Sequence, residues 1–421
     1  MTERLLQFIW QFQYFNKQEL TTETGEPLRI IFPGQHNQNQ GPDFTDAKVV
    51  IGNTTWAGTV ELHLQSSGWQ KHRHDTDSNY KNVILHVVWE NDASVTGSIP
   101  LLVLQHRVAT LMLNRYRELM TSTSFIPCEK SIQDAGSLVW QAWKERLAAE
   151  RLIRKAQTAL RFLDENRYHW EETCWWLLAK NFGMKVNAEA FEAVARSLPL
   201  TILAKHKQQI HQLESLLLGQ AGLLNDRFEE DYPRLLQREY QFLKTKYSLP
   251  PVPIPVHWLR MRPGNFPTLR LAQLAMLIHT SVHLFSRIKE AASAKEVRAW
   301  FAVTANDYWH YHYRFDETSP FKKKQLGAAM IDNIIINSLA PLLFTYGNYH
   351  NQEVYKRKAL RWLEETAAEK NVITRGFVQI GVKAATAFDS QALLELKNQY
   401  CQTKHCLDCA VGNAILKKQM P

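Results

Sequence analysis

The stretch from residue 34 to residue 90 constrains the fold most, because short apolar runs alternate there with polar turns. Three runs have the length of strands: Ala47–Ile51, Thr55–Leu64 and Val83–Trp89. A Gly-Pro-Asp-Phe turn that contains Asp43 precedes the first run. The pattern predicts a hairpin followed by a buried strand, and therefore a sheet in the N-terminal part of the chain.

Two acidic residues of this stretch are predicted to converge. Residues two apart on a strand share a face, so Glu61 and His63 project together and Leu62 points to the opposite side. If the first two runs pair as a hairpin, Asp43 lies beside Glu61. An Asp and a Glu next to a third polar group favour a hard cation, Mg²⁺ or Mn²⁺. The alternative is a half-exposed edge strand preceded by an ordinary turn.

A second set of ligand-type side chains follows the hairpin. His72, His74 and Asp77 lie between the second and third runs, and His86 lies within the third run. These residues are predicted to form a second layer around the acidic pair. Imidazole and carboxylate groups are also transition-metal ligands, so a competing metal site is the alternative.

The order of these residues resembles the core of the PD-(D/E)XK nuclease superfamily. There, two carboxylates hold Mg²⁺, and a Lys two residues after the Glu positions or activates water. The resemblance implies that Asp43 and Glu61, with the Leu62 carbonyl, bind Mg²⁺ or Mn²⁺. His63 stands where the Lys belongs, and it would orient the water or act as a base.

The chain as a whole resembles an uncharacterised bacterial family that is defined by a conserved domain of unknown function. The resemblance rests on the motifs GPDF, W-x-G-x-V-E-x-H, H-x-H-x-x-D and N-F-P and on the terminal cysteines. These motifs are spread over nearly the whole chain. The resemblance implies no particular activity.

Five polar residues are predicted to contact phosphate. Under the nuclease mechanism, Gln35 and Asn39 would bind phosphate or outer-sphere water. Arg260, Arg262 and Arg270 flank a turn before a predicted helix, and both arginine and a helix N-terminus suit phosphate groups. The alternative is a junction between lobes, in which these arginines pair with acids of the first domain.

Three cysteines gather near the C-terminus. Cys401, Cys406 and Cys409 follow the spacing Cys-x4-Cys-x2-Cys, and either Cys128 or His405 is available as a fourth ligand. Four thiolates bind Zn²⁺ or hold an iron–sulfur cluster. The alternative is a set of free cysteines on a terminal helix. The N-terminus lacks the pattern of a signal peptide, so reduced thiols or a metal site are expected rather than disulfides.

The sequence changes character after residue 125. Up to that point, a helix at 2–17, several strands and a helix at Val108–Leu119 predict an α+β domain that is compatible with the nuclease core. Residues 126–421 predict a helical domain, in which the proline-rich segment Leu249–Pro255 is a linker between two lobes in one interpretation. Helices are predicted from Trp140 beyond Phe162 and at 168–182, 187–197, 201–219, 227–246, 268–292, 294–315, 326–345, 352–369 and 389–398.

Composition limits the function only loosely. The 421 residues are 45% hydrophobic, which is enough for two or three domains. The 50 basic and 41 acidic residues give a net charge of +9, which allows a nucleic-acid partner without requiring one. Uninterrupted apolar stretches stay below the roughly 18 residues of a membrane span, so a cytoplasmic protein without a membrane partner is expected.

The sequence therefore predicts an α+β fold, with an N-terminal mixed α/β nuclease-like core followed by a large all-α region. The predicted function is a metal-dependent nuclease that holds Mg²⁺ or Mn²⁺ at Asp43 and Glu61. One alternative is a catalytically inactive nucleic-acid-binding or scaffold protein that keeps this core. Another is a metal hydrolase centred on the histidines His63, His72, His74 and His86.

Overall fold

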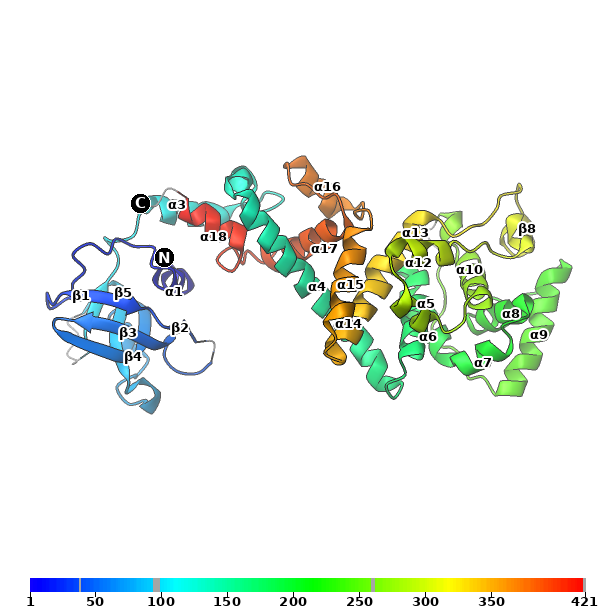
Figure 1. Cartoon of the computed structure of the whole chain (residues 1–421), viewed down its shortest axis with the longest axis horizontal. Coiled ribbons are helices and arrows are strands. Elements are labelled where there is room, and N and C mark those ends of the chain that lie inside the picture. The colour runs from blue at the N-terminus through cyan, green and yellow to red at the C-terminus, as the bar shows by residue number, and fades with distance from the viewer. Residues whose placement is uncertain (38, 94–98, 259–261, 419–421) are drawn as a thin grey trace. The chain divides into compact units, whose positions relative to one another are not determined.

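The computed structural model describes residues 1–37, 39–93, 99–258 and 262–418. The chain forms two compact units (Figure 1): unit 1 comprises Met1–Trp143 and Leu396–Pro421, and unit 2 comprises Lys144–Glu395. The fold is α+β, with a mixed sheet near the N-terminus and a large helical region. The predicted boundary at residue 125 differs from this division in two ways. Unit 1 continues to Trp143, and it also includes the last segment of the chain.

Unit 1 is built on a six-stranded sheet in the order β1-β3-β4-β5-β6, with β2 paired to β3. The strands are β1 (Leu28–Phe32), β2 (Gln35–His36), β3 (Phe44–Ile51), β4 (Thr54–Gln65), β5 (Val83–Glu90) and β6 (Leu101–Val103). The strands β1, β3 and β4 are antiparallel, whereas β4, β5 and β6 are parallel. The predicted hairpin is therefore β3–β4, and the predicted buried strand β5 lies directly beside it.

Helix α1 (Glu3–Gln11) covers one face of this sheet. Its buried side chains are Leu5, Leu6, Phe8, Ile9 and Trp10. They share a core with Val60 and Leu62 of β4. The helix is shorter than the predicted range 2–17, because Gln13 adopts a left-handed backbone conformation with φ of 56°.

The other face of β4 carries Glu61 and His63, which are buried there. The chain crosses from β4 to the parallel strand β5 through α2 (Gly68–Lys71) and a 3₁₀ turn, η1 (Ser78–Tyr80). Parallel neighbours require such a crossover, and here it is short. The crossover brings a polar segment to the buried polar face of β4.

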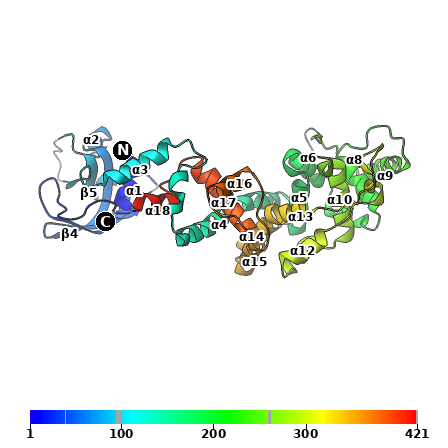
Figure 2. The ribbon, with the colours of Figure 1, turned by 90° about the horizontal axis from the view of Figure 1, so that it is seen from above.

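The C-terminal segment of the chain completes unit 1. The segment contains the π-helical turn η6 (Leu396–Cys401) and helix α18 (Ala410–Lys417). It contacts helix α3 (Thr110–Thr121) and the 3₁₀ helix η2 (Glu129–Asp134). Helix α18 lies beside α3 in both views (Figures 1 and 2) and contacts η2. Leu407 and Leu416 join the core that contains α1, and Tyr14 donates a hydrogen bond to Asn413 Oδ1 at 2.8 Å.

Unit 2 is helical. Its helices are α4 (Ser137–Glu165, which begins in unit 1), α5 (Trp170–Phe182), α6 (Met184–Ser197), α7 (Leu200–Lys205), α8 (Ile210–Gln220), α9 (Asp231–Tyr247), α10 (Pro267–Thr280), α11 (Leu284–Glu290), α12 (Ala294–Phe301), α13 (Ala328–Ile334), α14 (Ala340–Tyr349), α15 (Glu353–Glu364), α16 (Val372–Gln379) and α17 (Ala387–Glu395). Shorter elements are η3 (Pro263–Asn265), η4 (Asp307–His310), η5 (Ile335–Leu339), β7 (His312–Arg314) and β8 (Glu317–Thr318).

Four predictions for this region need correction. The helix predicted at 201–219 is interrupted, because α7 ends at Lys205 and α8 begins at Ile210. The helix predicted at 268–292 is interrupted after Thr280, where Ser281 is extended and His283 is left-handed with φ of 45°. The helix predicted at 294–315 ends at Phe301 and is followed by η4 and β7. Leu249–Pro255 does not separate two lobes, because Leu249 is buried in a core shared by the helices on both sides of it.

Within the part of the chain that the structure describes, one helical run is long and apolar enough to cross a membrane by composition alone. It covers Ala328–Tyr349, which includes α13, η5 and α14, and 72% of its most apolar window is buried inside the protein. A central core helix has the same composition, because both of its sides face other helices. Packing within unit 2 therefore accounts for the apolar character of this run.

Candidate metal centre

Asp43 and Glu61 lie together at the start of β3 and on β4. The backbone N–H of Asp43 donates to Glu61 Oε2 at 3.0 Å, and the backbone N–H of Leu62 donates to Asp43 Oδ2 at 3.1 Å. Gln7 Nε2, from α1, donates to Asp43 Oδ1 at 2.8 Å. Three of the four carboxylate oxygens thus accept hydrogen bonds from the protein. The fourth, Glu61 Oε1, faces the histidines.

Burial opposes the ionisation of both acids. It raises the pKa of Glu61 to about 8, and the nearby charge of Asp43 adds to the effect. It raises the pKa of Asp43 to about 6, although the Leu62 N–H partly offsets the rise. Two carboxyl groups this close cannot both ionise easily without a positive charge nearby. The pair therefore favours a cation at the open Glu61 oxygen.

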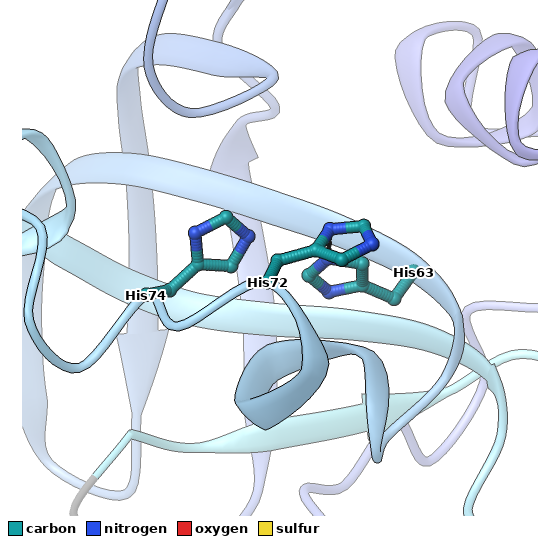
Figure 3. A group of neighbouring side chains, drawn as sticks. All are labelled: His63, His72 and His74. Carbon is teal, nitrogen blue, oxygen red and sulfur yellow. Dashed lines mark hydrogen bonds between the residues drawn. The ribbon is translucent and has the colours of Figure 1, made fainter.

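Three histidines lie close to one another on this side of β4 (Figure 3). His63 projects from β4, His72 ends α2, and His74 lies in the turn that follows. One ring nitrogen of each lies within 4.8 Å of the others, and His63 Nε2 is 3.2 Å from His72 Nδ1. Glu61 Oε1 is 3.4 Å from His74 Nε2 and 3.7 Å from His63 Nε2. The three imidazoles therefore lie together, and the Glu61 oxygen approaches two of them, His63 and His74.

His86 lies behind this group on β5, in register with Glu61. His86 Nε2 is 2.9 Å from His63 Nδ1. With its proton on Nδ1, His63 donates to His86 and presents the Nε2 lone pair to the other ligand-type groups. This is the outer partner that metal-bound histidines commonly have.

The buried imidazoles of His63 and His74 are held in the neutral form that binds metals. Burial, followed by the neighbouring imidazoles, lowers the pKa of His63 to about 3. Burial also lowers the pKa of His86 to about 4 and lowers the pKa of His74. Metal binding requires a neutral imidazole, so these groups lose no protons when an ion enters at neutral pH.

The distances fit a transition metal. Tetrahedral ligands at Zn–N and Zn–O bond lengths of about 2.0–2.1 Å lie about 3.3 Å apart. Three of the separations, 3.2, 3.4 and 3.7 Å, are close to that spacing, and the three imidazoles lie within 4.8 Å of one another, so small side-chain rotations would complete a tetrahedral site. His74 Nε2 is buried without a hydrogen-bond partner among the described residues, which is costly unless an ion occupies the site.

Two aromatic residues position the group of three histidines, and neither was predicted to do so from the sequence. Tyr80 stacks on His74 with ring centroids 3.7 Å apart, and Trp69 packs edge-on against the same ring at 5.2 Å. Trp69 Nε1 donates to Asp75 Oδ1 at 2.7 Å, which fixes the indole. The only signal in the sequence was their place within the histidine-rich segment.

Gly68 is required by the close approach of α2 to β4. A Cβ at this position would lie 2.8 Å from His63 Cγ. Real Cβ atoms do not approach a ring carbon that closely, so any side chain here would displace the imidazole. The glycine therefore lets the crossover lie directly on His63.

Two residues predicted as alternative ligands have other roles. Asp77 caps η1 by accepting a hydrogen bond from the Asn79 N–H at 2.9 Å. His86 contacts His63 and lies outside the group of three imidazoles. The histidine group that the structure brings together is therefore His63, His72 and His74.

The predicted phosphate-binding residues are scattered. Gln35 on β2 and Asn39 in the loop before Asp43 are both exposed. Arg260 lies outside the described residues, and Arg262 is exposed in unit 2. Arg270 is buried and donates to Asn265 Oδ1 at 2.6 Å and Gln273 Oε1 at 3.0 Å, so its guanidinium is engaged within unit 2. Phosphate contacts by these residues stay a prediction.

Comparison with known proteins places the chain in a family. The family model described as "Protein of unknown function (DUF2851)" matches residues 3–372, which include the acidic pair and the three histidines but not Cys401, Cys406 or Cys409. No curated protein and no solved structure matches the chain. The chain therefore belongs to the DUF2851 family.

Proposed function

We propose that unit 1 is a metal-dependent hydrolase of phosphodiester bonds, with a transition-metal ion bound by Glu61, His63, His72 and His74. The observation that carries the proposal is the grouping of three imidazoles within 4.8 Å of one another, with Glu61 Oε1 close to His63 and His74. Such an ion lowers the pKa of water and stabilises the charge that develops on the substrate oxygens.

The residues of the chain supply the geometry. Asp43 holds Glu61 through its backbone N–H, so Oε1 stays turned toward the histidines. His86 fixes the orientation of His63 from behind. His72 is exposed, whereas His63 and His74 are buried, so substrate reaches the centre from the side of His72.

Phosphodiesters are the proposed substrate class because of the order of helices and strands around the centre. The order helix, strand, hairpin, short helix and parallel strand resembles the PD-(D/E)XK core, with Asp43 and Glu61 on the hairpin. The net charge of +9 is compatible with a nucleic-acid partner. Whether that partner is DNA or RNA is an outcome of the assay below, and the expected site of action is the cytoplasm.

A second candidate is a nuclease that holds Mg²⁺ or Mn²⁺ between Asp43 and Glu61, with His63 in the place of the Lys. The direct contact between the two acids favours it. In this candidate, Asp43 must lose the hydrogen bond from Gln7 or from the Leu62 N–H before it can bind the ion. The transition-metal proposal needs no such rearrangement and is therefore preferred.

The experiment is a cleavage assay on the full-length protein. The chain is stripped with a chelator and reloaded with Zn²⁺, Co²⁺, Mn²⁺ or Mg²⁺, and labelled single- and double-stranded DNA and RNA are the substrates. His72→Ala removes an exposed ligand at little cost to folding, and His106→Ala changes an exposed histidine of unit 1 outside the centre. We expect His72→Ala to lower metal affinity at least about tenfold and to abolish cleavage, with His106→Ala unchanged.

Other outcomes decide between the alternatives. Activity with Mg²⁺ that survives His72→Ala and is lost in Asp43→Asn would establish the second candidate. Nucleic-acid binding that needs no divalent ion and survives Asp43→Ala, without cleavage, would instead indicate a scaffold or binding protein.

A further inference from the structure

We infer that unit 1 contains a second metal centre, with a structural role, formed by Cys128, Cys401, Cys406 and Cys409. Its occupant is a thiophilic metal, either zinc or an iron–sulfur cluster. This centre is independent of the proposed hydrolase function, because it shares no residue with the histidine group. Its expected effect is to fix the C-terminal segment of the chain within unit 1.

The fold brings the four cysteines to one region from distant parts of the sequence. Cys128 directly precedes η2, Cys401 ends η6, and Cys409 directly precedes α18, which contacts η2. Cys406 lies in the turn before Cys409 and joins the core against which Cys128 packs. The fifth cysteine, Cys174, lies in α5 of unit 2.

The four thiols lie close enough for their charges to interact. Burial raises the pKa of Cys128 to about 12, and the neighbouring Cys409 and Cys406 add to the rise. Burial also raises the pKa of Cys401, with further contributions from Cys409, Cys128 and Cys406. All four cysteines are free of disulfides. Without a metal these buried thiols stay protonated, and a thiophilic cation bound among them would displace their protons and stabilise the thiolates.

Hydrogen-bond donors around Cys409 partly offset the effect of burial on this thiol. Burial raises the pKa of this thiol, but the backbone N–H groups of Gly412 and Val411 and the Trp143 side chain act in the opposite direction. N–H groups directed at sulfur are common around thiolate-bound metals, because they stabilise the negative charge that the metal needs.

The turn that carries Cys406 and Cys409 is tight. A Cβ at Gly412 would lie 2.2 Å from the Cys406 carbonyl oxygen, so only glycine allows the helix to start this close to the turn. The Cys409 N–H donates to the same oxygen at 3.4 Å. The backbone therefore holds two cysteines of a Cys-x2-Cys pair on one short loop, which is the usual way of presenting two thiolates to one metal.

Besides the packing of Leu407 and Leu416 in the core, this segment makes polar contacts with the rest of unit 1. Lys404 Nζ donates to the Met120 carbonyl, and Lys418 forms an ion pair with Asp134 at 2.6 Å. Exposed ion pairs contribute little to stability. A metal bound to Cys128 and to the three C-terminal cysteines would cross-link the same two regions much more firmly.

The test is elemental analysis of the full-length protein, purified with and without oxygen, together with a visible spectrum. The variants are Cys406→Ser and Cys409→Ser, and Cys174→Ala is the matched control from unit 2. His72→Ala is measured as well, so that metal at the histidine group is counted separately. We expect about one zinc or about four irons per chain at the cysteines, in addition to the metal that His72→Ala removes. The metal at the cysteines should fall at least tenfold in the two serine variants and be fully retained in Cys174→Ala and His72→Ala.

A second measurement covers the case in which the serine variants fail to fold. The wild-type protein is titrated with p-hydroxymercuribenzoate while released zinc or iron is followed with a chromogenic chelator. Release in step with the modification of four thiols supports the inference. Five thiols that titrate without metal release, or a metal content in Cys406→Ser that equals that of the wild type, would overturn it. Broad absorbance near 400 nm would identify the iron–sulfur form.

Discussion

At the scale of single residues, Glu61 combines two contacts in one carboxyl group. Its Oε2 accepts a hydrogen bond from the Asp43 N–H, and its Oε1 faces His63 and His74. Because burial and the charge of Asp43 raise its pKa to about 8, Glu61 is mostly protonated at neutral pH without a cation. An ion that binds at Glu61 must displace this proton, and the negative charge of the two carboxylates then attracts the ion.

Glu214 is a buried acid of a different kind, in unit 2. It accepts hydrogen bonds from Trp309 Nε1 at 3.0 Å and from the Tyr232 hydroxyl at 2.8 Å, and burial raises its pKa from 4.5 to about 7. The folded state therefore holds this proton more tightly than the unfolded state does. The stability that results is fully present below pH 4.5 and is lost as the pH rises to about 7.

We predict that Glu214→Gln flattens this pH dependence. A shift of this size corresponds to about 3 kcal/mol between the two pH limits. The measurement is the opening free energy of α8 by hydrogen exchange at a series of pH values. The exposed Glu229→Gln is the control, and it should keep the wild-type slope. An unchanged slope in Glu214→Gln would show that this carboxyl group does not control the stability of unit 2.

At the scale of elements, the centre depends on how closely α2 lies on β4. A Cβ at Gly68 would meet His63 at 2.8 Å, whereas a Cβ at Gly136 has no atom within 4 Å. The crossover from β4 to β5 also carries His72 and His74. Movement of this one element therefore separates the imidazoles without disturbing the opposite, apolar face of the sheet.

We predict that Gly68→Ala weakens metal binding by about 10- to 100-fold while the protein stays folded. The reason is that His63 must rotate away from the methyl group, which increases its distance from Glu61 Oε1. Zinc affinity measured by competition with a chromophoric chelator gives the result, and circular dichroism checks the fold. Gly136→Ala is the control. Equal zinc affinities in the two variants would rule out this role for Gly68.

The sequence predicted the strands of unit 1 well, because the alternation of side chains and the turn residues act locally. The contact of Asp43 with Glu61 followed from pairing the two runs as a hairpin, and β3–β4 has that pairing. The convergence of His72 and His74 on His63 was not predictable in the same way, because it depends on the path of the crossover. The break after Thr280 was also missed, since neither glycine nor proline marks it.

At the scale of the whole molecule, the chain returns to unit 1 at its end. Residues 396–421 belong to the same compact unit as residues 1–143. Leu416 is fully buried in the core that contains α1. Local periodicity does not reveal such long-range packing, which is why the sequence analysis assigned the last helix to the helical domain.

We predict that Leu416→Ala destabilises unit 1 by about 2–5 kcal/mol, because it leaves a cavity in that core. Hydrogen exchange should become faster in α1 and β4 and stay unchanged in α8 of unit 2. Leu138→Ala, at a position that is 77% exposed, is the control and should have little effect. Faster exchange confined to α18 would contradict the assignment of the C-terminal segment to the core of unit 1.

The most direct test of the proposed centre is X-ray absorption at the zinc edge of the full-length protein, in wild type and in His72→Ala. The proposal predicts a shell of nitrogen and oxygen atoms at about 2.0–2.1 Å with imidazole scattering. In His72→Ala this shell should be lost, while any sulfur shell from the cysteines should remain. A spectrum with sulfur ligands alone, or a nitrogen and oxygen shell that is identical in His72→Ala, would contradict the proposal.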